Sequence, residues 1–383
     1  MTIAVVATVL VGAACGGDSL PAATTVPGVT TSSDAAVTST RGSGTPTAPG
    51  EPRDLDVDAQ AITGFEAFGL AVDGTTIWMT DFDGGVIRSI DTVSAELGVD
   101  IEVGANPVGI AAGGGEVWVA NSNSSEHTVM KIDAATGEVL ATIDTGAGSS
   151  PTGVALTDDY VWVAVADKGA VAQIDRASAQ LVRVIESEGP SGGQFRVDVV
   201  AMDDTVWVVD RFCGRVIHID ATTGEITAIH DDLGFESTEP DCLGGVIADG
   251  PLRLGVFEGG IFVFADVVLE GEGHVRRISR IDPATDMATV IIDLAIVPFL
   301  SGPIGQPAFI VADNAIWFSV GTRSARMDRG TGLVDFVVGG RDSTVAAFAV
   351  VDGVIWHAIA HDDPGQSGLY GVDALEADEA ADS

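Results

Sequence analysis

Val117-Trp118-Val119-Ala120-Asn121 is followed, a few polar residues later, by Ile132-Asp133-Ala134-Ala135-Thr136-Gly137. The first run is apolar at successive positions, which is typical of a strand whose two faces are both buried. In the second run, Asp, Thr and Gly have the spacing of a tight hairpin, in which Gly adopts positive φ at no steric cost. The two runs predict a four-stranded antiparallel unit with strands at 108–112, 116–121, 128–133 and 138–144.

The same pair of runs recurs along the chain. All six Trp residues occupy the centre of the first run, and a seventh copy has Phe262 in that place. An apolar-Asp pair follows each copy. The seven aromatic residues are Trp78, Trp118, Trp162, Trp207, Phe262, Trp317 and Trp356, and the seven Asp residues are Asp91, Asp133, Asp175, Asp220, Asp282, Asp328 and Asp373. The period of about 46 residues is the length of one four-stranded propeller blade.

We therefore predict an all-β fold, a seven-bladed β-propeller over residues 54–375. Blades stacked face to face bury both faces of every sheet, whereas an open sheet with one wet face would alternate apolar and polar residues. The last copy lacks a fourth strand, because residues 374–383 are acidic and have little to bury. Residues 55–62, ahead of the first copy, are expected to supply that strand and to close the ring, which protects an exposed edge.

Composition limits the classes of function. The chain has 383 residues, 46% of them hydrophobic, and a formal net charge of −38. The apolar content excludes a mostly disordered chain. The charge excludes a general nucleic-acid-binding protein, because no basic surface is available for phosphates, and it argues against docking on anionic lipid headgroups. A monomer is expected.

The first fifty residues predict a signal segment and a tether. Residues 2–14 are apolar and small, and Cys15 follows them. A helix of that length reaches only about 20 Å, short of the ~30 Å hydrocarbon core, so we interpret residues 1–15 as a signal segment. Residues 16–53 are rich in Thr, Ser, Pro and Gly, which predicts a disordered linker. Residues 376–383 form an acidic tail.

Residues 10–15, Leu-Val-Gly-Ala-Ala-Cys, resemble the lipobox of bacterial lipoproteins. The resemblance implies lipidation of Cys15 and a membrane partner reached through that N-terminal lipid anchor. Gly12 stands where the family prefers Leu, and no Lys or Arg precedes Arg41, so the natural start is expected upstream. An ordinary secretory signal is the alternative. Either way the propeller is expected outside the cytoplasm, lipid-anchored to the outer face of the bacterial cell membrane or secreted.

Four acidic or amide side chains are candidate metal ligands. The loops between the second and third strands of the copies share one face of a propeller, the usual binding surface. Asp81, Asn121 and Asp210 each stand three residues after their Trp, and Asp266 lies one residue further along its own copy. Oxygens that converge on the central channel would suit Ca²⁺ or Mg²⁺. The alternative is that each side chain closes its own turn by hydrogen-bonding nearby backbone.

Two His-containing loops are candidate catalytic sites. His361 and Asp362 lie in the last of these loops, and His127 lies in the second. A His beside a carboxylate can act as a general base or a metal ligand. The alternative is solvated loop side chains, since the six His residues show no metal-binding spacing.

Two of the three Cys residues are expected on the same face. Cys213 lies in the fourth of these loops and Cys242 in the linker that follows that copy. In an oxidising compartment a disulfide between them would clamp the long loop 231–245. Closing about 30 residues would stabilise the fold by roughly 3 kcal/mol. Two unpaired, buried thiols are the alternative.

Three elements of the repeat carry a family resemblance. The Pro-x-Gly starts at 107–109 and 151–153, the run at 117–121 and the Ile-Asp-x-x-Thr-Gly turns resemble the YVTN/YncE-type β-propellers over roughly residues 65–375. The repeat is also similar to that of the virginiamycin B (streptogramin) lyases. That likeness implies a propeller; the lyases' catalytic His and Glu with bound Mg²⁺ have no matching motif here, nor do the motifs of metal-dependent lactonases.

Two functions stay open at this point. The first is a surface-anchored scaffold that binds a protein or a small molecule on the face carrying these loops. The second is a metal-dependent lyase or lactonase with its site at the central channel of the same face.

Overall fold

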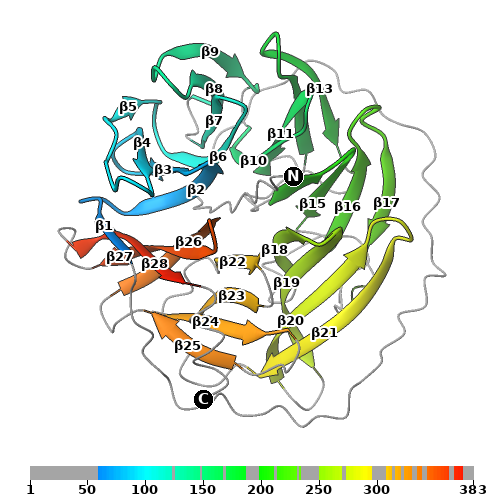
Figure 1. Ribbon diagram of the computed structural model, residues 1–383. Helices are drawn as coiled ribbons and strands as arrows, with labels where there is room; N and C mark the ends of the chain where they lie inside the picture. Colours follow the sequence, from blue (N-terminus) through cyan, green and yellow to red (C-terminus); the bar gives the residue numbers. More distant parts are fainter. Residues whose placement is uncertain are drawn as a thin grey trace.

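The computed structural model describes residues 59–122, 126–146, 149–166, 170–186, 198–210, 214–230, 233, 250–269, 273–295, 308–312, 315–320, 323–329, 334–338, 343–361 and 366–373. Within these residues the chain forms 28 strands in seven four-stranded antiparallel sheets, which succeed one another around a ring (Figure 1). Each sheet is one blade, whose strands a to d run from the centre of the ring outward. The predicted seven-bladed propeller is confirmed.

The first four blades follow one another along the chain without a crossover. Blade 1 comprises β2 (Ala67–Asp73), β3 (Thr76–Asp81), β4 (Val86–Asp91) and β5 (Ile101–Glu102), and blade 2 comprises β6 (Pro107–Gly113), β7 (Glu116–Asn121), β8 (Thr128–Asp133) and β9 (Val139–Asp144). Blade 3 comprises β10 (Pro151–Leu156), β11 (Tyr160–Val165), β12 (Ala170–Asp175) and β13 (Gln180–Glu186), and blade 4 comprises β14 (Val199–Met202), β15 (Thr205–Asp210), β16 (Arg215–Asp220) and β17 (Ile226–His230).

The last three blades complete the ring. Blade 5 comprises β18 (Gly250–Phe257), β19 (Gly260–Leu269), β20 (Gly273–Asp282) and β21 (Met287–Ala295), and blade 6 comprises β22 (Phe309–Ala312), β23 (Ala315–Val320), β24 (Arg323–Asp328) and β25 (Val334–Val338). Blade 7 comprises β26 (Ser343–Val351), β27 (Val354–His361), β28 (Gly368–Asp373) and, as its outermost strand, β1 (Ala59–Ile62).

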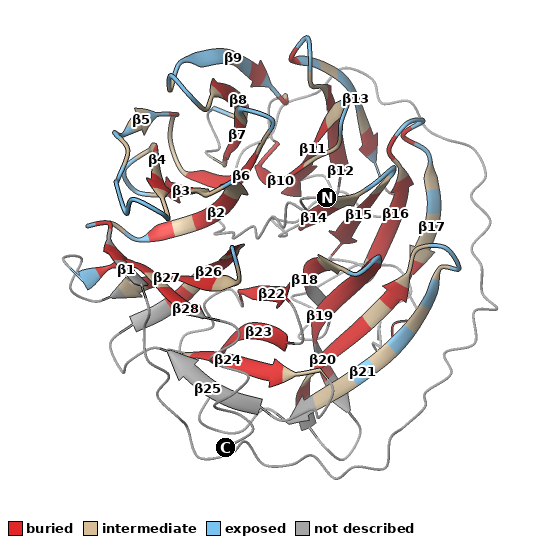
Figure 2. Cartoon of the chain, viewed as in Figure 1, coloured by how far each residue is buried: buried red, intermediate tan, exposed pale blue. Residues whose placement is uncertain are grey.

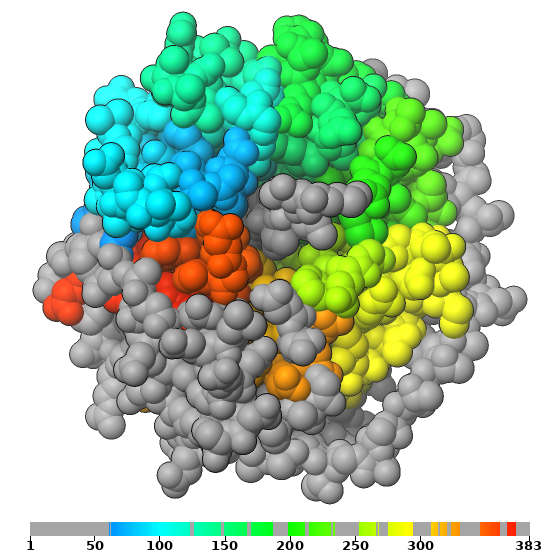
Figure 3. Space-filling view, viewed as in Figure 1, coloured from blue at the N-terminus to red at the C-terminus, as the bar shows by residue number. Residues whose placement is uncertain are grey.

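Blade 7 joins the two ends of the chain. β1 pairs antiparallel with β28, with Ala59 opposite Gly371 and Ile62 opposite Gly368. β26 also contacts β2 of blade 1, and the orange-red surface of blade 7 adjoins the blue surface of blade 1 (Figure 3). The predicted closure by the N-terminal strand is therefore confirmed. It leaves no edge between the first and last blades open to another chain.

The core lies between adjacent blades, and the Trp residues form much of it. Trp118, Trp162, Trp207 and Trp317 are fully buried, and each packs against its own blade and the next one around the ring. Figure 2 shows the consequence, with inner strands buried and strand d of several blades partly exposed. An aromatic side chain of this size removes roughly 150–250 Å² from water. One large aromatic residue per blade, Trp in six blades and Phe262 in blade 5, therefore contributes to the cohesion between blades.

The turns between strands c and d hold the shape that the sequence predicts. In blade 2, Asp133 Oδ1 accepts hydrogen bonds from the Thr136 N–H at 2.8 Å and from its hydroxyl at 2.9 Å. Gly137 then takes φ of 72°. Blade 1 has the same turn, but Ala95 takes the position of that Gly, at φ 56°. An Ala in this region costs about 1 kcal/mol relative to Gly.

Two expected loops begin later than the sequence suggested. Asp266 was expected to begin a loop, but β19 runs on to Leu269, and Asp266 pairs within the sheet opposite Arg276. The apolar Val267 explains this, because it is 1% exposed and extends the buried strand. His361 was likewise expected in a loop, but it is the last residue of β27 and pairs opposite Ser343 of the long strand β26.

No helix within the described residues combines the length and the apolar character that crossing a bilayer requires.

Candidate functional site

The antiparallel order of the strands gives the ring two faces. We call the face that carries the b–c loops and the linkers between blades the top face, and the face that carries the a–b and c–d turns the bottom face. Every candidate residue from the sequence belongs to the top face or to the segments outside the described residues. The latter group comprises Cys15, Cys213, Cys242 and Asp362.

Asp81, Asn121 and Asp210 occupy the same place, the last residue of strand b, in blades 1, 2 and 4. Strand b is one strand removed from the innermost strand, so these side chains start some way from the channel. Asp81 Oδ1 accepts a hydrogen bond from the Gly84 N–H at 2.8 Å, and its carbonyl accepts one from Gly85 at 3.0 Å. Asp81 thus closes its own b–c turn.

Asn121 is fully buried and ties blade 2 to the linker that precedes it. Its amide Nδ2 donates to the Val103 carbonyl at 2.6 Å and to the Thr128 hydroxyl at 3.1 Å. Asn121 Oδ1 has no hydrogen-bond partner among the described residues. Both N–H donors of the Asn121 amide are therefore engaged within the fold, and Oδ1 remains as one buried acceptor.

Asp210 is 6% exposed and forms an ion pair across its own loop. Arg215 Nε donates to Asp210 Oδ2 at 2.9 Å, and the two residues are opposite one another in the β15–β16 register. Opposite charges placed across a strand pair stabilise the sheet locally. A positive charge beside the carboxylate also works against recruitment of a cation at this position.

His127 and the neighbouring Glu126 fasten the second b–c loop. Glu126 Oε2 accepts a hydrogen bond from the Ala105 N–H at 2.9 Å. His127 Nδ1 contacts the Ser149 carbonyl, and the His127 carbonyl accepts the Thr145 hydroxyl at 2.7 Å. A carbonyl partner requires the proton on Nδ1. Both side chains thus hold neighbouring segments of the loop together.

The structure does not gather the candidates into one centre. Of Asp266 and His361 it describes only the backbone, in β19 and β27, so their predicted roles stay predictions. Among the described residues, no three His, Cys, Asp or Glu side chains are grouped so that they could hold a metal ion.

Two buried, opposite charges on the innermost strands were missed by sequence reasoning. Asp198 and Arg253 are each 2% exposed, at the same position of blades 4 and 5. Burial raises the pKa of Asp198, and the charge of Arg253 partly offsets that effect. Asp198 also accepts a hydrogen bond from the Leu254 N–H at 2.9 Å. The pair therefore links the two blades beside the channel.

The corresponding position in blades 1 and 2 is Gly. A Cβ on Gly69 would lie 2.5 Å from the Val108 carbonyl, and one on Gly109 would collide with the Thr152 carbonyl. The Pro-x-Gly starts thus have a packing role, since Gly lets neighbouring innermost strands approach closely.

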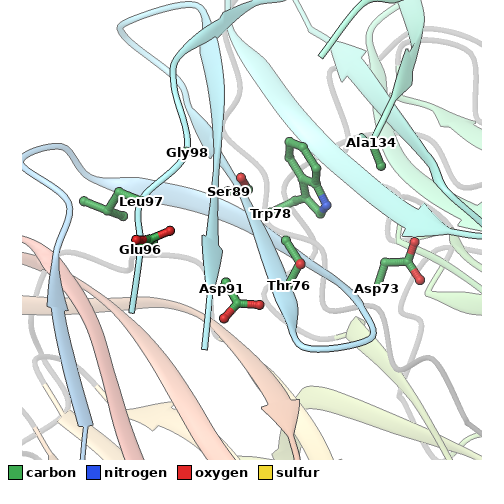
Figure 4. A pocket seen from close by; sticks show the side chains of 9 residues that line it. All are labelled: Asp73, Thr76, Trp78, Ser89, Asp91, Glu96, Leu97, Gly98 and Ala134. Carbon is green, nitrogen blue, oxygen red and sulfur yellow. The ribbon is translucent and has the colours of Figure 1, made fainter. Parts of the chain in front are cut away.

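A pocket of about 290 Å³ opens on the bottom face, between blades 1 and 2 (Figure 4). Its lining residues are Asp73, Thr76, Trp78, Ser89, Asp91, Glu96, Leu97, Gly98 and Ala134. Trp78 is 3% exposed, and its indole lines the pocket. The pocket combines one indole with three carboxylates, which is the chemistry of a site for an organic cation.

Two features of blade 1 account for this pocket. Ser89 stands opposite Trp78 in the β3–β4 register, where blade 2 has Lys131 opposite Trp118. Strand d of blade 1 is also short, because β5 pairs only with Val86 and Ile87 and Leu97 forms a single bridge to Ile90. The pocket forms where blade 1 packs against blade 2, so its position depends on how the two blades pack.

Comparison with known proteins supports the fold. No protein-family model matches the chain, and neither does the sequence of any curated protein. Among solved structures, a hydrazine synthase chain from Kuenenia stuttgartiensis is similar, with a TM-score of 0.59 and 15% identity over 86% of this chain and 99% of that chain. A streptogramin B lyase has a TM-score of 0.58 and 14% identity over 83% of this chain and 96% of that chain.

A third structure is a catalytically inactive variant of virginiamycin B lyase from Staphylococcus aureus with quinupristin. It has a TM-score of 0.60 and 16% identity over 84% of this chain and 98% of that chain. At such identities the likeness extends to the architecture alone. The chain is an all-β, seven-bladed propeller that shares its fold with the streptogramin lyases and with a hydrazine synthase chain.

Proposed function

We propose that this protein is an extracytoplasmic, lipid-anchored propeller that acts as a binding scaffold, with its top face directed away from the membrane. The direction of β1 supports the orientation. β1 runs antiparallel to β28, from Ala59 near the bottom face to Ile62 near the top. A tether that precedes Ala59 therefore reaches the ring at the bottom face. As a flexible coil, residues 16–53 would span about 35 Å on average.

The observation that carries the scaffold function is how the top-face polar groups are used. Asp81 closes its own turn, Asp210 is paired with Arg215, and Glu126 holds the Ala105 amide. Asn121 donates hydrogen bonds from its amide to the Val103 carbonyl and the Thr128 hydroxyl. Side chains engaged in this way fix the loops in place. A rigid surface suits recognition of a partner, because little conformational entropy is lost on binding.

The anchor is tested by removing the predicted lipidation site. In a bacterial host, Cys15→Ser should release the chain from the membrane fraction into the periplasm or medium. Ser19→Ala, in the predicted linker, is the matched control, since it leaves Cys15 in place. Equal membrane retention of wild type and Cys15→Ser would contradict lipid anchoring.

The alternative function, a metal-dependent lyase or lactonase at the top of the channel, is favoured by the shared fold with the streptogramin lyases. Chromatography coupled to mass spectrometry of quinupristin incubated with the chain and Mg²⁺ separates the two proposals, because ring opening by a lyase changes the retention time without changing the mass, whereas a lactonase adds one water. The scaffold function expects intact antibiotic at all times. A ring-opened product that forms with turnover would replace it with the lyase function.

The proposed Ca²⁺ or Mg²⁺ belongs to that alternative. Isothermal titration with each ion should give no saturable heat if the scaffold function holds. A saturable heat that disappears in both Asp81→Ala and Asp210→Ala would favour the metal site. Because a structural ion would give the same heat, the quinupristin assay still decides between the functions.

A further inference from the structure

The pocket on blade 1 occupies a place that blades 2 to 6 fill with a long side chain. One residue of strand c stands directly opposite the central aromatic residue of strand b in every blade. In ring order these residues are Ser89, Lys131, Gln173, His218, Arg280, Arg326 and Gly371. Four of the seven are basic side chains. Ser89 in blade 1 and Gly371 in blade 7 are the short ones.

Blade 2 shows what such a side chain does. Lys131 Nζ lies 5.2 Å from the centre of the Trp118 ring. It forms an ion pair with Glu116 Oε1 at 2.6 Å and donates to the carbonyl of Arg176, in blade 3, at 2.8 Å. The Trp118 N–H in turn donates to Glu116 Oε2 at 3.2 Å. One ammonium group and one carboxylate together satisfy the indole.

Blades 3 and 4 repeat the arrangement with other groups. Gln173 Nε2 donates to the carbonyl of Ala221, in blade 4, at 3.3 Å. His218 stacks on Trp207 with ring centres 4.0 Å apart, and its Nδ1 lies 3.0 Å from Asp286 in blade 5. In blades 2 and 4 the residue on strand c covers the aromatic ring, and in blades 2, 3 and 4 it reaches the c–d turn of the next blade.

Blade 1 lacks every one of these groups. Ser89 is too short to reach the next blade, and Ala134 stands where blade 3 has Arg176. Thr76 stands where blade 2 has Glu116, so blade 1 has no carboxylate at the position from which Glu116 accepts the Trp118 N–H. The pocket that results keeps the carboxylates of Asp73, Asp91 and Glu96 in its lining. The buried indole therefore lacks both the cation and the acceptor that blade 2 supplies from its own chain.

We propose that this pocket binds the ammonium group of a lysine side chain supplied by another polypeptide. The alkyl stem lies along Trp78 as Lys131 does along Trp118, and the ammonium group pairs with the carboxylates. A peptide carbonyl of the partner accepts the Trp78 N–H. Of the three carboxylates, that of Glu96 has no hydrogen bond or ion pair among the described residues, so it is fully available.

Two observations favour a polypeptide over a free amine. Val93, Leu97 and Val99, on the segment that lines the pocket, are 77%, 41% and 81% exposed and offer apolar contact for a larger partner. The net charge of −38 attracts a basic partner. The site lies on the bottom face, so its test depends neither on the lipid anchor nor on the top face.

Nuclear magnetic resonance of the six indole N–H groups tests the proposal on the intact propeller. Trp78→Phe identifies the Trp78 signal, and the probe is Nα-acetyl-lysine N-methylamide. We expect the Trp78 signal to shift saturably with this probe but not with Nα-acetyl-norleucine N-methylamide, which lacks the ammonium group. The Trp118 signal should stay still, because Lys131 already occupies its site. No shift at Trp78, or an equal shift with norleucine, overturns the proposal.

Variants decide whether the pocket itself binds the probe. Ser89→Lys should abolish binding by filling the pocket from within, and Ser89→Ala is the control that keeps it open. Ala134→Arg closes the same space from blade 2, should Ser89→Lys not fold. Glu96→Gln should weaken binding by roughly two- to fivefold. Unchanged binding in a folded Ser89→Lys or Ala134→Arg variant would place the probe elsewhere.

A free amine distinguishes the source of the ammonium group. n-Butylamine carries the same ammonium on an alkyl stem but has no peptide carbonyl for the Trp78 N–H. It should bind more weakly than the lysine derivative. Tighter saturation by n-butylamine would assign the pocket to free amines and overturn the polypeptide partner.

Discussion

Blades 1 and 2 are adjacent and have the same strand order and the same type of c–d turn. They differ in the side chains that surround their Trp residues. In blade 2, Lys131 and Glu116 cover and satisfy Trp118. In blade 1, Ser89 leaves Trp78 beside an open pocket. The repeat therefore retains the buried aromatic residue of strand b but not the side chain of strand c that packs over it. That second position is free to vary, and it is where a repeat protein can acquire a site.

The largest expected difference between the blades comes from removing the Trp itself. Trp118→Ala should lower the free energy of unfolding by about 4 kcal/mol. The substitution creates a closed cavity and removes the indole that Lys131 and Glu116 contact. Trp78→Ala should cost about 1–2 kcal/mol less, since no hydrogen bond or cation–π contact is lost and water can enter from the pocket. Chemical denaturation of both variants measures this, and equal losses would contradict the comparison.

A third blade extends the comparison to a covering group without a charged partner. His357 of blade 7 is fully buried against Trp317 and Phe348, and burial lowers its pKa to about 4. Its Nδ1 donates to the carbonyls of Ile355 and Tyr370, both at 3.1 Å. Unlike Lys131, it must therefore be neutral in the fold.

The consequence is a loss of stability in acid. Between pH 6.5 and about 4 the unfolded chain binds a proton that buried His357 does not, so the free energy of unfolding falls as the pH falls through this window. A shift of this size amounts to about 3 kcal/mol. His357→Asn keeps a donor but cannot titrate, so it should remove that part of the pH dependence. An unchanged pH profile in denaturation experiments would refute the assignment.

Converting blade 2 into blade 1 is the next test in size. Partial burial raises the pKa of Glu116, but hydrogen bonds from Lys131, Arg176 and Trp118 outweigh it, so the pKa lies below its usual value. Lys131→Ser removes two short contacts of the ammonium group and should cost about 2 kcal/mol. Lys131→Met, which fills the space without charge, is the control and should cost less. Equal stability of Lys131→Ser and wild type would show that the covering group is dispensable.

The smallest expected effects come from exchanging Gly and Ala between the c–d turns of the two blades. Gly137→Ala in blade 2 should destabilise by about 1 kcal/mol, because the position has φ of 72°. Ala95→Gly in blade 1 should stabilise by up to about 1 kcal/mol, since Ala95 has φ of 56°. Thermal unfolding of the single variants checks both signs. Two changes in the same direction would mean that packing at these turns outweighs backbone strain.

Most of the fold was predictable, and the physical reason is repetition. Runs such as 116–121 and 128–133 are apolar enough to be buried on both faces, and the structure places β7 and β8 over the same residues. The closing strand was predictable because the last copy lacked one. The lengths of the blade 5 strands were not, since Val267 to Leu269 extend a strand only where β20 offers a partner.

The candidate sites were less predictable than the fold. Asp81, Asn121 and Asp210 were correctly given equivalent positions, but their partners lie in turns and linkers whose paths the sequence does not specify. The sequence did not single out Asp198, because its partners, Arg253 and the Leu254 amide, belong to the neighbouring blade. The pocket depends on Ala134 of a different blade and was invisible for the same reason.

The number of blades, the buried aromatic residue of each blade and the turns between strands c and d could all be predicted from the amino-acid pattern. These are local features, since strand patterning and turn chemistry act over a few residues. The residues that cover each Trp, the carboxylates that are buried and the position of the pocket became known only from the three-dimensional structure. Those outcomes depend on side chains such as Lys131 and Ser89 meeting residues of the next blade, and such meetings follow from packing between blades rather than from spacing along the chain.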